Sequence, residues 1–212
     1  MKKKVIVIGD GGHAKVVIDI IHEMQKYDII GVTSLNCNLK EFCGYPILGD
    51  DSILLEYLKQ GVNNIAMGIG GFKDNKLRTK LYNNFANLGF NIINAIHPKT
   101  IISKSVIIGN GVTIFPGVVI NPEVKIGNNV IIATSATIDH ESVIKNNSLI
   151  SAGATIGANT IVGEGTLCAL GSKVISGVTI GKNCLIAAGA VVVNDIDDNS
   201  TVFGIPAKKL IK

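Results

Sequence analysis

Residues 126–156 read IGNNVIIATSATIDHESVIKNNSLISAGATI, with an isoleucine at every sixth position. A six-residue period is typical of a coil in which each hexad contributes one short strand and one turn. Three hexads close a triangular coil with the aliphatic residue inward, so the stretch predicts a parallel β-helix. The register runs on in both directions, and fifteen of its sixteen positions are Ile or Val: Ile102, Ile108, Ile114, Ile120, Ile126, Ile132, Ile138, Ile144, Ile150, Ile156, Val162, Cys168, Val174, Ile180, Ile186 and Val192.

Two weaker patterns accompany this repeat. Small or apolar residues recur four places after the repeat residue, as at Val112, Ala136, Ala154 and Ala190. Glycine recurs directly after it, where we expect it to ease the corner of the coil, at Gly109, Gly127, Gly157, Gly163 and Gly181. A single triangular coil would also leave some apolar side chains pointing outward, and Phe115 and Val118 are expected among them.

The first 98 residues follow a different pattern, in which short apolar runs alternate with helical periodicity. Strands are expected at residues 5–8, 29–32, 65–69 and 91–96, and helices at residues 14–25, 51–60 and 74–89. This alternation predicts a small parallel sheet with right-handed crossovers. We therefore expect a Rossmann-like α/β domain at residues 1–98 and a β-helix domain with a C-terminal tail at residues 99–212.

Composition excludes several classes of protein. Of the 212 residues, 47% are hydrophobic and 17% charged, which is not the composition of a disordered chain. The net charge of +4 comes without basic clusters interleaved with aromatics, so no nucleic-acid partner is expected. No apolar run approaches the ~18 residues of a membrane span, and the apolar stretch after the N-terminal lysines is too short for a signal peptide. The four cysteines have no CxxC spacing, which indicates neither a metal site nor a disulfide framework. We expect a cytoplasmic protein.

The glycine-rich segment between the first strand and helix has the form Gly9-x-Gly11-x-x-Ala14, the dinucleotide fingerprint in its proper context. Backbone N–H groups at such a helix start suit a diphosphate. An NAD site usually adds an acidic residue after the second strand, but here Thr33-Ser34 follows, and the domain is only half a full Rossmann unit. The segment therefore favours a nucleotide diphosphate-sugar. His13, in the first helical turn, either contacts the sugar or diphosphate or only supports the helix start.

Several motifs together point to a known family. The hexads are followed by GIPAK at residues 204–208, and this combination resembles the left-handed β-helix of hexapeptide acyltransferases. GDGGHAK at residues 9–15, GIG at 68–70 and NKLR at 75–78 narrow the resemblance. The whole chain resembles the sialic acid O-acetyltransferase-like family. That family includes N-acetyltransferases of nucleotide-linked 4-amino-4,6-dideoxy sugars such as bacillosamine and perosamine.

The resemblance implies a left-handed β-helix, a homotrimer, and acetyl-CoA bound between neighbouring β-helices with no metal. It implies a nucleotide-linked amino sugar held against the α/β domain. The implied catalytic residues are His140 and Glu141. The implied acetyl-CoA positions are Ala158, Leu170, Ala188 and Lys208, and the implied substrate positions are Gly9, Gly11, Gly12, His13 and Gly70.

His140 is the only histidine inside the repeat, and it stands at a corner where no core residue is needed. Without the family, an ordinary solvent-facing corner residue is the plainer interpretation. An imidazole titrates near neutrality and can accept a proton from an attacking amine. A carboxylate on its far nitrogen would orient the ring. Glu141 can reach it only if the chain bends there, because adjacent side chains of a flat strand diverge. Asp139 is the other candidate.

The sequence departs from the bacillosamine-type enzymes at two positions near His140. Where those enzymes have an asparagine seven residues before the base and a second histidine nine after it, this chain has Ala133 and Leu149. Neither side chain donates a hydrogen bond, so we expect any oxyanion contact to come from backbone N–H groups near Gly157-Ala158. Thr33-Ser34 likewise replaces the family's acidic residues after the second strand, which leaves the nucleotide base open.

The positions implied for acetyl-CoA have plainer interpretations as well. Ala158, Leu170 and Ala188 suit a pantetheine arm, but each could be ordinary wall of the β-helix. Lys208 and Lys209 could pair with a CoA phosphate or simply belong to a solvated tail.

The sequence thus predicts an acetyl-CoA-dependent N-acetyltransferase of a nucleotide-linked amino sugar. O-acetylation of a sialic acid or related sugar is the alternative with the same chemistry. A non-catalytic nucleotide-sugar-binding protein, in which the β-helix only trimerises, is the alternative from another class. A γ-class carbonic anhydrase shares the β-helix but needs three histidines on zinc, and His140 is the only one in the repeat.

Overall fold

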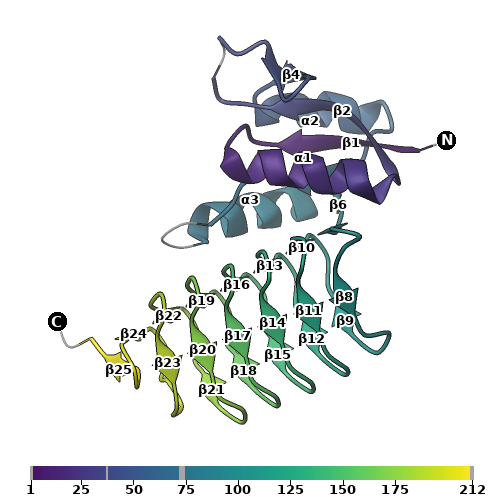
Figure 1. Cartoon of the computed structure of the whole chain (residues 1–212). Coiled ribbons are helices and arrows are strands. Elements are labelled where there is room, and N and C mark those ends of the chain that lie inside the picture. Colours follow the sequence, from purple (N-terminus) through teal and green to yellow (C-terminus); the bar gives the residue numbers. More distant parts are fainter. Residues whose placement is uncertain (1, 37, 72–74, 211–212) are drawn as a thin grey trace. The chain divides into compact units, whose positions relative to one another are not determined.

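The computed structural model describes residues 2–36, 38–71 and 75–210. Two compact units make up the chain, an α/β unit at Met1–Pro98 and a β-helix unit at Lys99–Lys212. Figure 1 shows helices α1, α2 and α3 in the first unit and regularly repeated coils in the second. Within the described ranges, no helix is long and apolar enough to cross a membrane.

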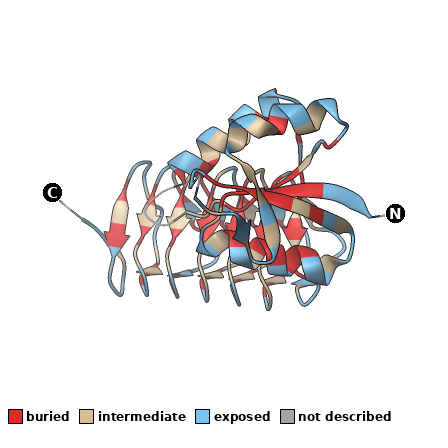
Figure 2. Cartoon of the chain, turned by 90° about the horizontal axis from the view of Figure 1, so that it is seen from above, coloured by how far each residue is buried: buried red, intermediate tan, exposed pale blue. Residues whose placement is uncertain are grey.

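The α/β unit is built on one sheet with the strand order β3-β4-β2-β1-β5-β6. Its strands are β1 (Lys3–Ile8), β2 (Tyr27–Thr33), β3 (Glu41–Phe42), β4 (Tyr45–Gly49), β5 (Asn64–Met67) and β6 (Asn91–Ile92), followed by β7 (Ala95–Ile96). Its helices are α1 (Gly12–Met24), a 3-10 turn η1 (Asp51–Ile53), α2 (Leu54–Lys59) and α3 (Lys76–Asn87). The central strand β1 pairs in parallel with β2 and β5, and its last four residues are fully buried (Figure 2).

The predicted parallel sheet and its helices are confirmed, with three differences. Helix α1 begins at Gly12, two residues earlier than predicted, and so starts directly on the glycine segment. The antiparallel β3–β4 hairpin was not predicted, because β3 has only two residues and shows no alternation. The strand expected at residues 91–96 is divided into β6, which pairs with β5, and β7, which does not continue that pairing.

The β-helix unit consists of short strands, two residues long except for β24, stacked in three sheets that are parallel up to the antiparallel β25. The first sheet contains β8 (Ile101–Ile102), β11 (Val119–Ile120), β14 (Thr137–Ile138), β17 (Thr155–Ile156), β20 (Lys173–Val174) and β23 (Val191–Val192). The second contains β9 (Ile107–Ile108), β12 (Lys125–Ile126), β15 (Val143–Ile144), β18 (Ile161–Val162) and β21 (Thr179–Ile180). The third contains β10 (Thr113–Ile114), β13 (Ile131–Ile132), β16 (Leu149–Ile150), β19 (Leu167–Cys168), β22 (Leu185–Ile186), β24 (Thr201–Phe203) and the antiparallel β25 (Lys208–Lys209).

Successive coils are in register eighteen residues apart, as in the pairing of Thr137 with Thr155 and of Ile138 with Ile156. The second residue of each strand points inward, and from Ile114 to Val192 every residue of this predicted column is buried. The small residues four places later are buried as well. One expectation about them is wrong: Val118 lies in this second inward row and is fully buried rather than outward, and Phe115 is half-buried.

The corners of the coil are turned by residues other than the predicted glycines. Three residues after the inward Ile138, Glu141 adopts the left-handed region at φ 60°, and Asn129 does so at φ 58° after Ile126. The glycine directly after the repeat residue serves a different purpose. A Cβ on Gly163 would lie 2.4 Å from the backbone of Gly181 in the next coil, which is closer than atoms can approach. That glycine is needed for close stacking of coils, and the expectation that it eases the corner is wrong.

Candidate active site

His140 stands at the corner between β14 and β15, on the outside of the β-helix. The strand that precedes it points Ile138 into the core, and the residues that follow turn the chain away, so the His140 side chain projects outward and is 53% exposed. An exposed imidazole at a corner contributes nothing to the aliphatic core. It is free to serve a ligand.

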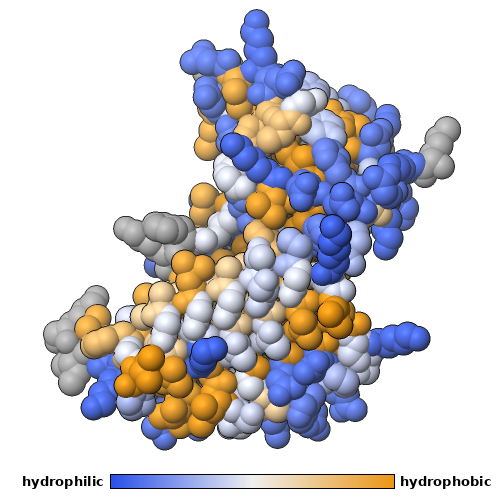
Figure 3. Space-filling view, in the orientation of Figure 1, coloured by the Kyte–Doolittle hydropathy of each residue, from blue (hydrophilic) through white to orange (hydrophobic). Residues whose placement is uncertain are grey.

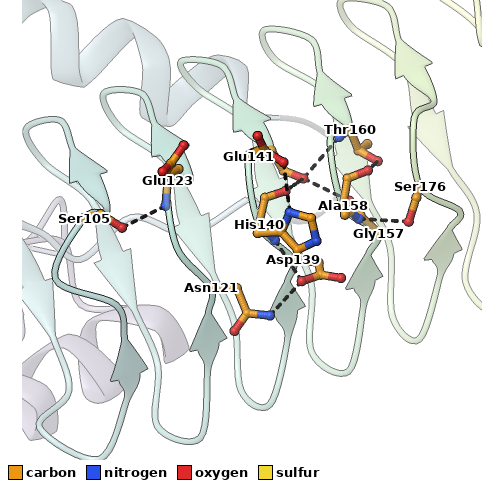
Figure 4. A network of polar contacts seen from close by, with 11 residues as sticks. Ser105, Asn121, Glu123, Asp139, His140, Glu141, Gly157, Ala158, Thr160 and Ser176 are labelled. Atoms are coloured by element: carbon orange, nitrogen blue, oxygen red, sulfur yellow. Dashed lines mark hydrogen bonds and ion pairs between the residues drawn. The ribbon is translucent and has the colours of Figure 1, made fainter.

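The His140 ring is held by its sequence neighbour Glu141. The distance between His140 Nδ1 and Glu141 Oε2 is 3.0 Å. Two adjacent side chains meet in this way because Glu141 has φ 60°, which supplies the bend that a flat strand lacks. The left-handed conformation is the regular corner of this β-helix, since Glu123 adopts it at φ 64° one coil earlier. The contact leaves Nε2 facing away from the carboxylate (Figure 4).

Asp139, the other candidate partner for the ring, is placed differently. Its Oδ1 accepts hydrogen bonds from Asn121 Nδ2 at 2.7 Å and from the backbone N–H of His140 at 2.8 Å. The Asn121 hydrogen bond, followed by that of the His140 N–H, lowers the pKa of Asp139 below its ordinary value. Asp139 therefore fixes the backbone under His140, and Glu141 orients the ring.

The coil after His140 carries Gly157 and Ala158, the expected source of an oxyanion contact. Asn159 N donates to His140 O at 2.9 Å, so the two coils lie side by side at this corner. The Gly157 N–H donates to Val174 O at 2.9 Å and is committed to the sheet. The Ala158 N–H instead donates to the Ser176 hydroxyl at 3.1 Å. Of the two N–H groups, only that of Ala158 remains a candidate for an oxyanion contact. Its acceptor is a side-chain hydroxyl that can rotate away, whereas the acceptor of Gly157 is a fixed backbone carbonyl.

The positions implied for acetyl-CoA do not lie together on the β-helix of a single chain. Ala158, half-buried, stacks on His140 at the corner between the first and second sheets. Leu170 and Ala188, both exposed, stack on each other at the corner between the third and first sheets. Lys208 lies in β25, where it is exposed. Two corners of one triangular coil cannot line a single groove, so these residues could do so only between two β-helices.

The glycine residues implied for the substrate do come together in the α/β unit. Gly9, at φ 88°, donates its N–H to Thr33 O at 3.1 Å, and α1 starts just beyond it. A Cβ on Gly11 or Gly12 would meet no atom within 4 Å, so the backbone there is open to a ligand. A Cβ on Gly70 would lie 3.0 Å from the His13 Cβ, so the loop after β5 packs against the first turn of α1.

His13 is kept neutral by its surroundings. Burial, with the positive charge of Arg78 as the smaller cause, lowers the pKa of His13 from 6.5 to about 3. A neutral imidazole can hydrogen-bond a diphosphate or sugar but cannot neutralise its charge. If His13 contacts the sugar or diphosphate, we therefore expect a hydrogen bond and not an ion pair.

Arg78, on α3, is the residue that sequence reasoning left without a role. It is fully buried, and its Nη1 donates to Ile69 O at 2.6 Å and to Met67 O at 3.1 Å. The same nitrogen lies 3.5 Å from His13 Nε2. Arg78 therefore ties the loop after β5 to α3 and to the start of α1. The sequence did contain a signal, because Arg78 shares the inward face of its helix with Phe85.

The part of the chain that the structure describes contains no group of three His, Cys, Asp or Glu side chains placed to hold a metal ion.

Comparisons with known proteins agree with this architecture. The model of the PglD N-terminal domain matches residues 4–85, and that of the bacterial transferase hexapeptide (six repeats) matches residues 105–140. PerB from Caulobacter crescentus, solved with CoA and GDP-perosamine, is 36% identical with a TM-score of 0.91, over 98% of this chain and 97% of that one. The acetyltransferase domain of PglB from Neisseria gonorrhoeae is 33% identical with a TM-score of 0.90, over 99% of this chain and 100% of that one.

The chain belongs to the hexapeptide-repeat acetyltransferases of the sialic acid O-acetyltransferase-like family. The resemblance found in the sequence is thereby confirmed, as is the left-handed β-helix typical of this acetyltransferase family. A variant of the Caulobacter crescentus GDP-perosamine N-acetyltransferase with one histidine changed to alanine is 35% identical, with a TM-score of 0.93, over 99% of this chain and 97% of that one. No curated protein sequence matches the chain.

Proposed function

We propose that this acetyltransferase transfers the acetyl group of acetyl-CoA to the amino group of a nucleotide-linked 4-amino-4,6-dideoxy sugar. The observation that carries the proposal is the oriented His140–Glu141 pair at the outer corner of a β-helix. It occurs in a chain 36% identical, over nearly its whole length, to an enzyme solved with CoA and GDP-perosamine. The open glycine segment before α1 supports a nucleotide diphosphate as the other half of the substrate. Because both proposed substrates are cytoplasmic metabolites, we place the enzyme in the cytoplasm.

In this proposal His140 acts as the general base. Its Nε2 takes the proton that the sugar amine loses on acylation, and Glu141 on Nδ1 stabilises the imidazolium that results. Acetyl-CoA supplies the acetyl thioester. The corner fits such a group, because the side chain stacked on His140 is only the methyl of Ala158. The proton held on His140 can then pass to the departing thiolate, which returns the base to its starting state.

The direct test is release of free thiol from acetyl-CoA in the presence of UDP-, dTDP- and GDP-linked 4-amino sugars. Thiol release with at least one of them, and an acetylated amino sugar as product, is the expected result. Release only with a sialic acid or a similar hydroxyl acceptor would replace N-acetylation by O-acetylation. Nucleotide-sugar binding without any acetyl-CoA binding would indicate a non-catalytic protein.

We also propose that the active form is a homotrimer with its sites between subunits. A groove of about 570 Å³ follows the outer face of β12, β15, β18 and β21, and its lining does not include His140. Exposed aliphatic side chains also lie on the outside of the β-helix: Ile101, Ile107, Ile161, Leu170 and Ile175. Figure 3 shows apolar patches on the face of the β-helix that is turned to the viewer. Such side chains favour a protein partner. Light scattering should give the mass of three chains, and a monomer of 22.3 kDa would contradict the proposal.

The strain at Glu141 leads to a prediction that separates stability from activity. Glycine has no Cβ penalty of about 1–2 kcal/mol in the left-handed region but loses about 0.5–1 kcal/mol more conformational entropy on folding. Glu141→Gly should therefore raise the free energy of unfolding by roughly 0.5–1 kcal/mol. It should also lower turnover by roughly 10–100-fold, because the ring loses its orienting carboxylate. Urea unfolding and thiol release measure the two effects.

The matched control is Glu123→Gly. Glu123 has φ 64° at the same corner one coil earlier, so this change should give the same gain in stability. Turnover should remain at the wild-type level. Equal turnover in both variants would show that Glu141 does not assist His140.

A further inference from the structure

The coils of the β-helix are joined at several corners by a side chain that accepts the hydrogen bond of a backbone N–H in the preceding coil. Asn128 Oδ1 accepts from the Asn110 N–H and Asn146 Oδ1 from the Asn128 N–H, each at 2.8 Å. Asp198 Oδ1 accepts from the Lys182 N–H at 2.7 Å. In these three cases the acceptor is an amide or carboxylate oxygen, and the contact stabilises the stacking of coils.

The corner that carries His140 departs from this arrangement. Its next coil has Ala158, which offers no side-chain acceptor, so the His140 N–H is bound by its own neighbour Asp139 instead. One coil further, the Ser176 hydroxyl accepts from the Ala158 N–H at 3.1 Å. Figure 4 shows His140, Ala158 and Ser176 on successive coils of the β-helix. At this corner, the coil next to His140 thus carries only the small side chain of Ala158, and the coil beyond it carries the Ser176 hydroxyl.

A hydroxyl differs from the other acceptors in that it can also donate. Ser176 is exposed, so packing does not hold its side chain in one rotamer. When another oxygen takes the Ala158 N–H, the hydroxyl can turn and donate its own proton to that same oxygen. Two donors aimed at one oxygen are the arrangement that stabilises a developing oxyanion.

On the proposed function, we infer that Ser176 is a further catalytic residue, which forms the oxyanion site together with the Ala158 N–H. As the amine nitrogen bonds to the thioester carbon, the electron pair of the carbonyl bond moves to oxygen, where these two donors hold it. The pair returns when the carbon–sulfur bond breaks, and the thiolate takes the proton that His140 accepted. Ala133 and Leu149 have no side-chain donor, and their backbone N–H groups bind carbonyl oxygens of the next coil. The Ser176 hydroxyl is therefore the side chain that can supply the second donor.

The test is the kinetics of Ser176→Ala. Because one donor remains, we expect kcat to fall by about 10–100-fold, at or below the 10²–10³ reported for the loss of an oxyanion donor. The KM for acetyl-CoA should stay within about twofold, since the contact is made only in the transition state. Ser176→Thr keeps the hydroxyl and should recover most of the lost kcat.

The matched control is Asn128→Ala, which removes the same kind of coil-to-coil hydrogen bond at another corner. It should lower the unfolding temperature about as much as Ser176→Ala and leave kcat unchanged. Equal losses of kcat in both variants, or full kcat in Ser176→Ala, would overturn the inference while leaving the proposed function intact. Wild-type protein that releases no thiol with any acceptor would overturn the proposed function, and this inference with it.

Discussion

His140→Ala is expected to lower turnover by about 10²–10⁴, the loss associated with removal of a positioned general base. The fold should survive, because the side chain is 53% exposed and lies outside the aliphatic column. Affinity for acetyl-CoA should hardly change, since the imidazole acts on the amine. Thiol release, calorimetric titration with acetyl-CoA and thermal unfolding would measure these three quantities.

The control for this experiment is Lys104→Ala, an exposed side chain at the same corner two coils earlier. It should leave turnover, affinity and stability unchanged. Glu141→Ala should reduce turnover less than His140→Ala, because orienting a base contributes less than being one. Near-normal turnover in His140→Ala would mean that the base lies elsewhere, and acylation of the free amine without a protein base would then be the leading mechanism.

The β-helix could be predicted from the sequence because each of its contacts repeats. Every coil places an inward side chain at the same hexad position, so the inward column appears in the sequence as an aliphatic residue or cysteine at sixteen successive sixth positions. The α/β unit has no such repetition. Its main strands and helices were evident from periodicity, but β3, with two residues, carries too little pattern to be recognised.

The sequence suggests which residues form the candidate site, and their roles remain a prediction, whereas their geometry is visible only in the structure. His140 and Glu141 stand out as a polar pair in an aliphatic repeat, but glutamate has no preference for the left-handed region that brings them together. The Ser176 contact depends on stacking between coils, which a single sequence does not record. The role of Arg78 cannot be predicted from its motif, because its hydrogen bonds go to carbonyl groups at the end of β5 and in the loop after it.

The neutral state of His13 predicts a stability that depends on pH. The pKa of His13 is lowered from 6.5 to about 3 by burial and by the charge of Arg78, so below pH 6.5 the unfolded chain binds a proton that the folded chain refuses. The free energy of unfolding is therefore not reduced by His13 above pH 6.5, and it decreases as the pH falls from 6.5 toward 3. Each pH unit in this interval should lower the free energy of unfolding by about 1.4 kcal/mol, which gives roughly 4–5 kcal/mol across the whole interval.

Urea unfolding at a series of pH values, followed by the helical signal in circular dichroism, would measure this loss. That signal reports on the α/β unit, where α1, α2 and α3 lie. His13→Asn and His13→Gln remove the titrating group, so their stability should fall less steeply with acid than that of the wild type. The comparison uses the slope of the free energy of unfolding against pH, so a variant that is less stable than the wild type at neutral pH remains informative. His22→Asn, at an exposed histidine of the same helix, should keep the wild-type slope. Equal slopes in wild type and both His13 variants would show that His13 is protonated in the folded protein as readily as in the unfolded chain, and that it can meet a diphosphate as a cation after all.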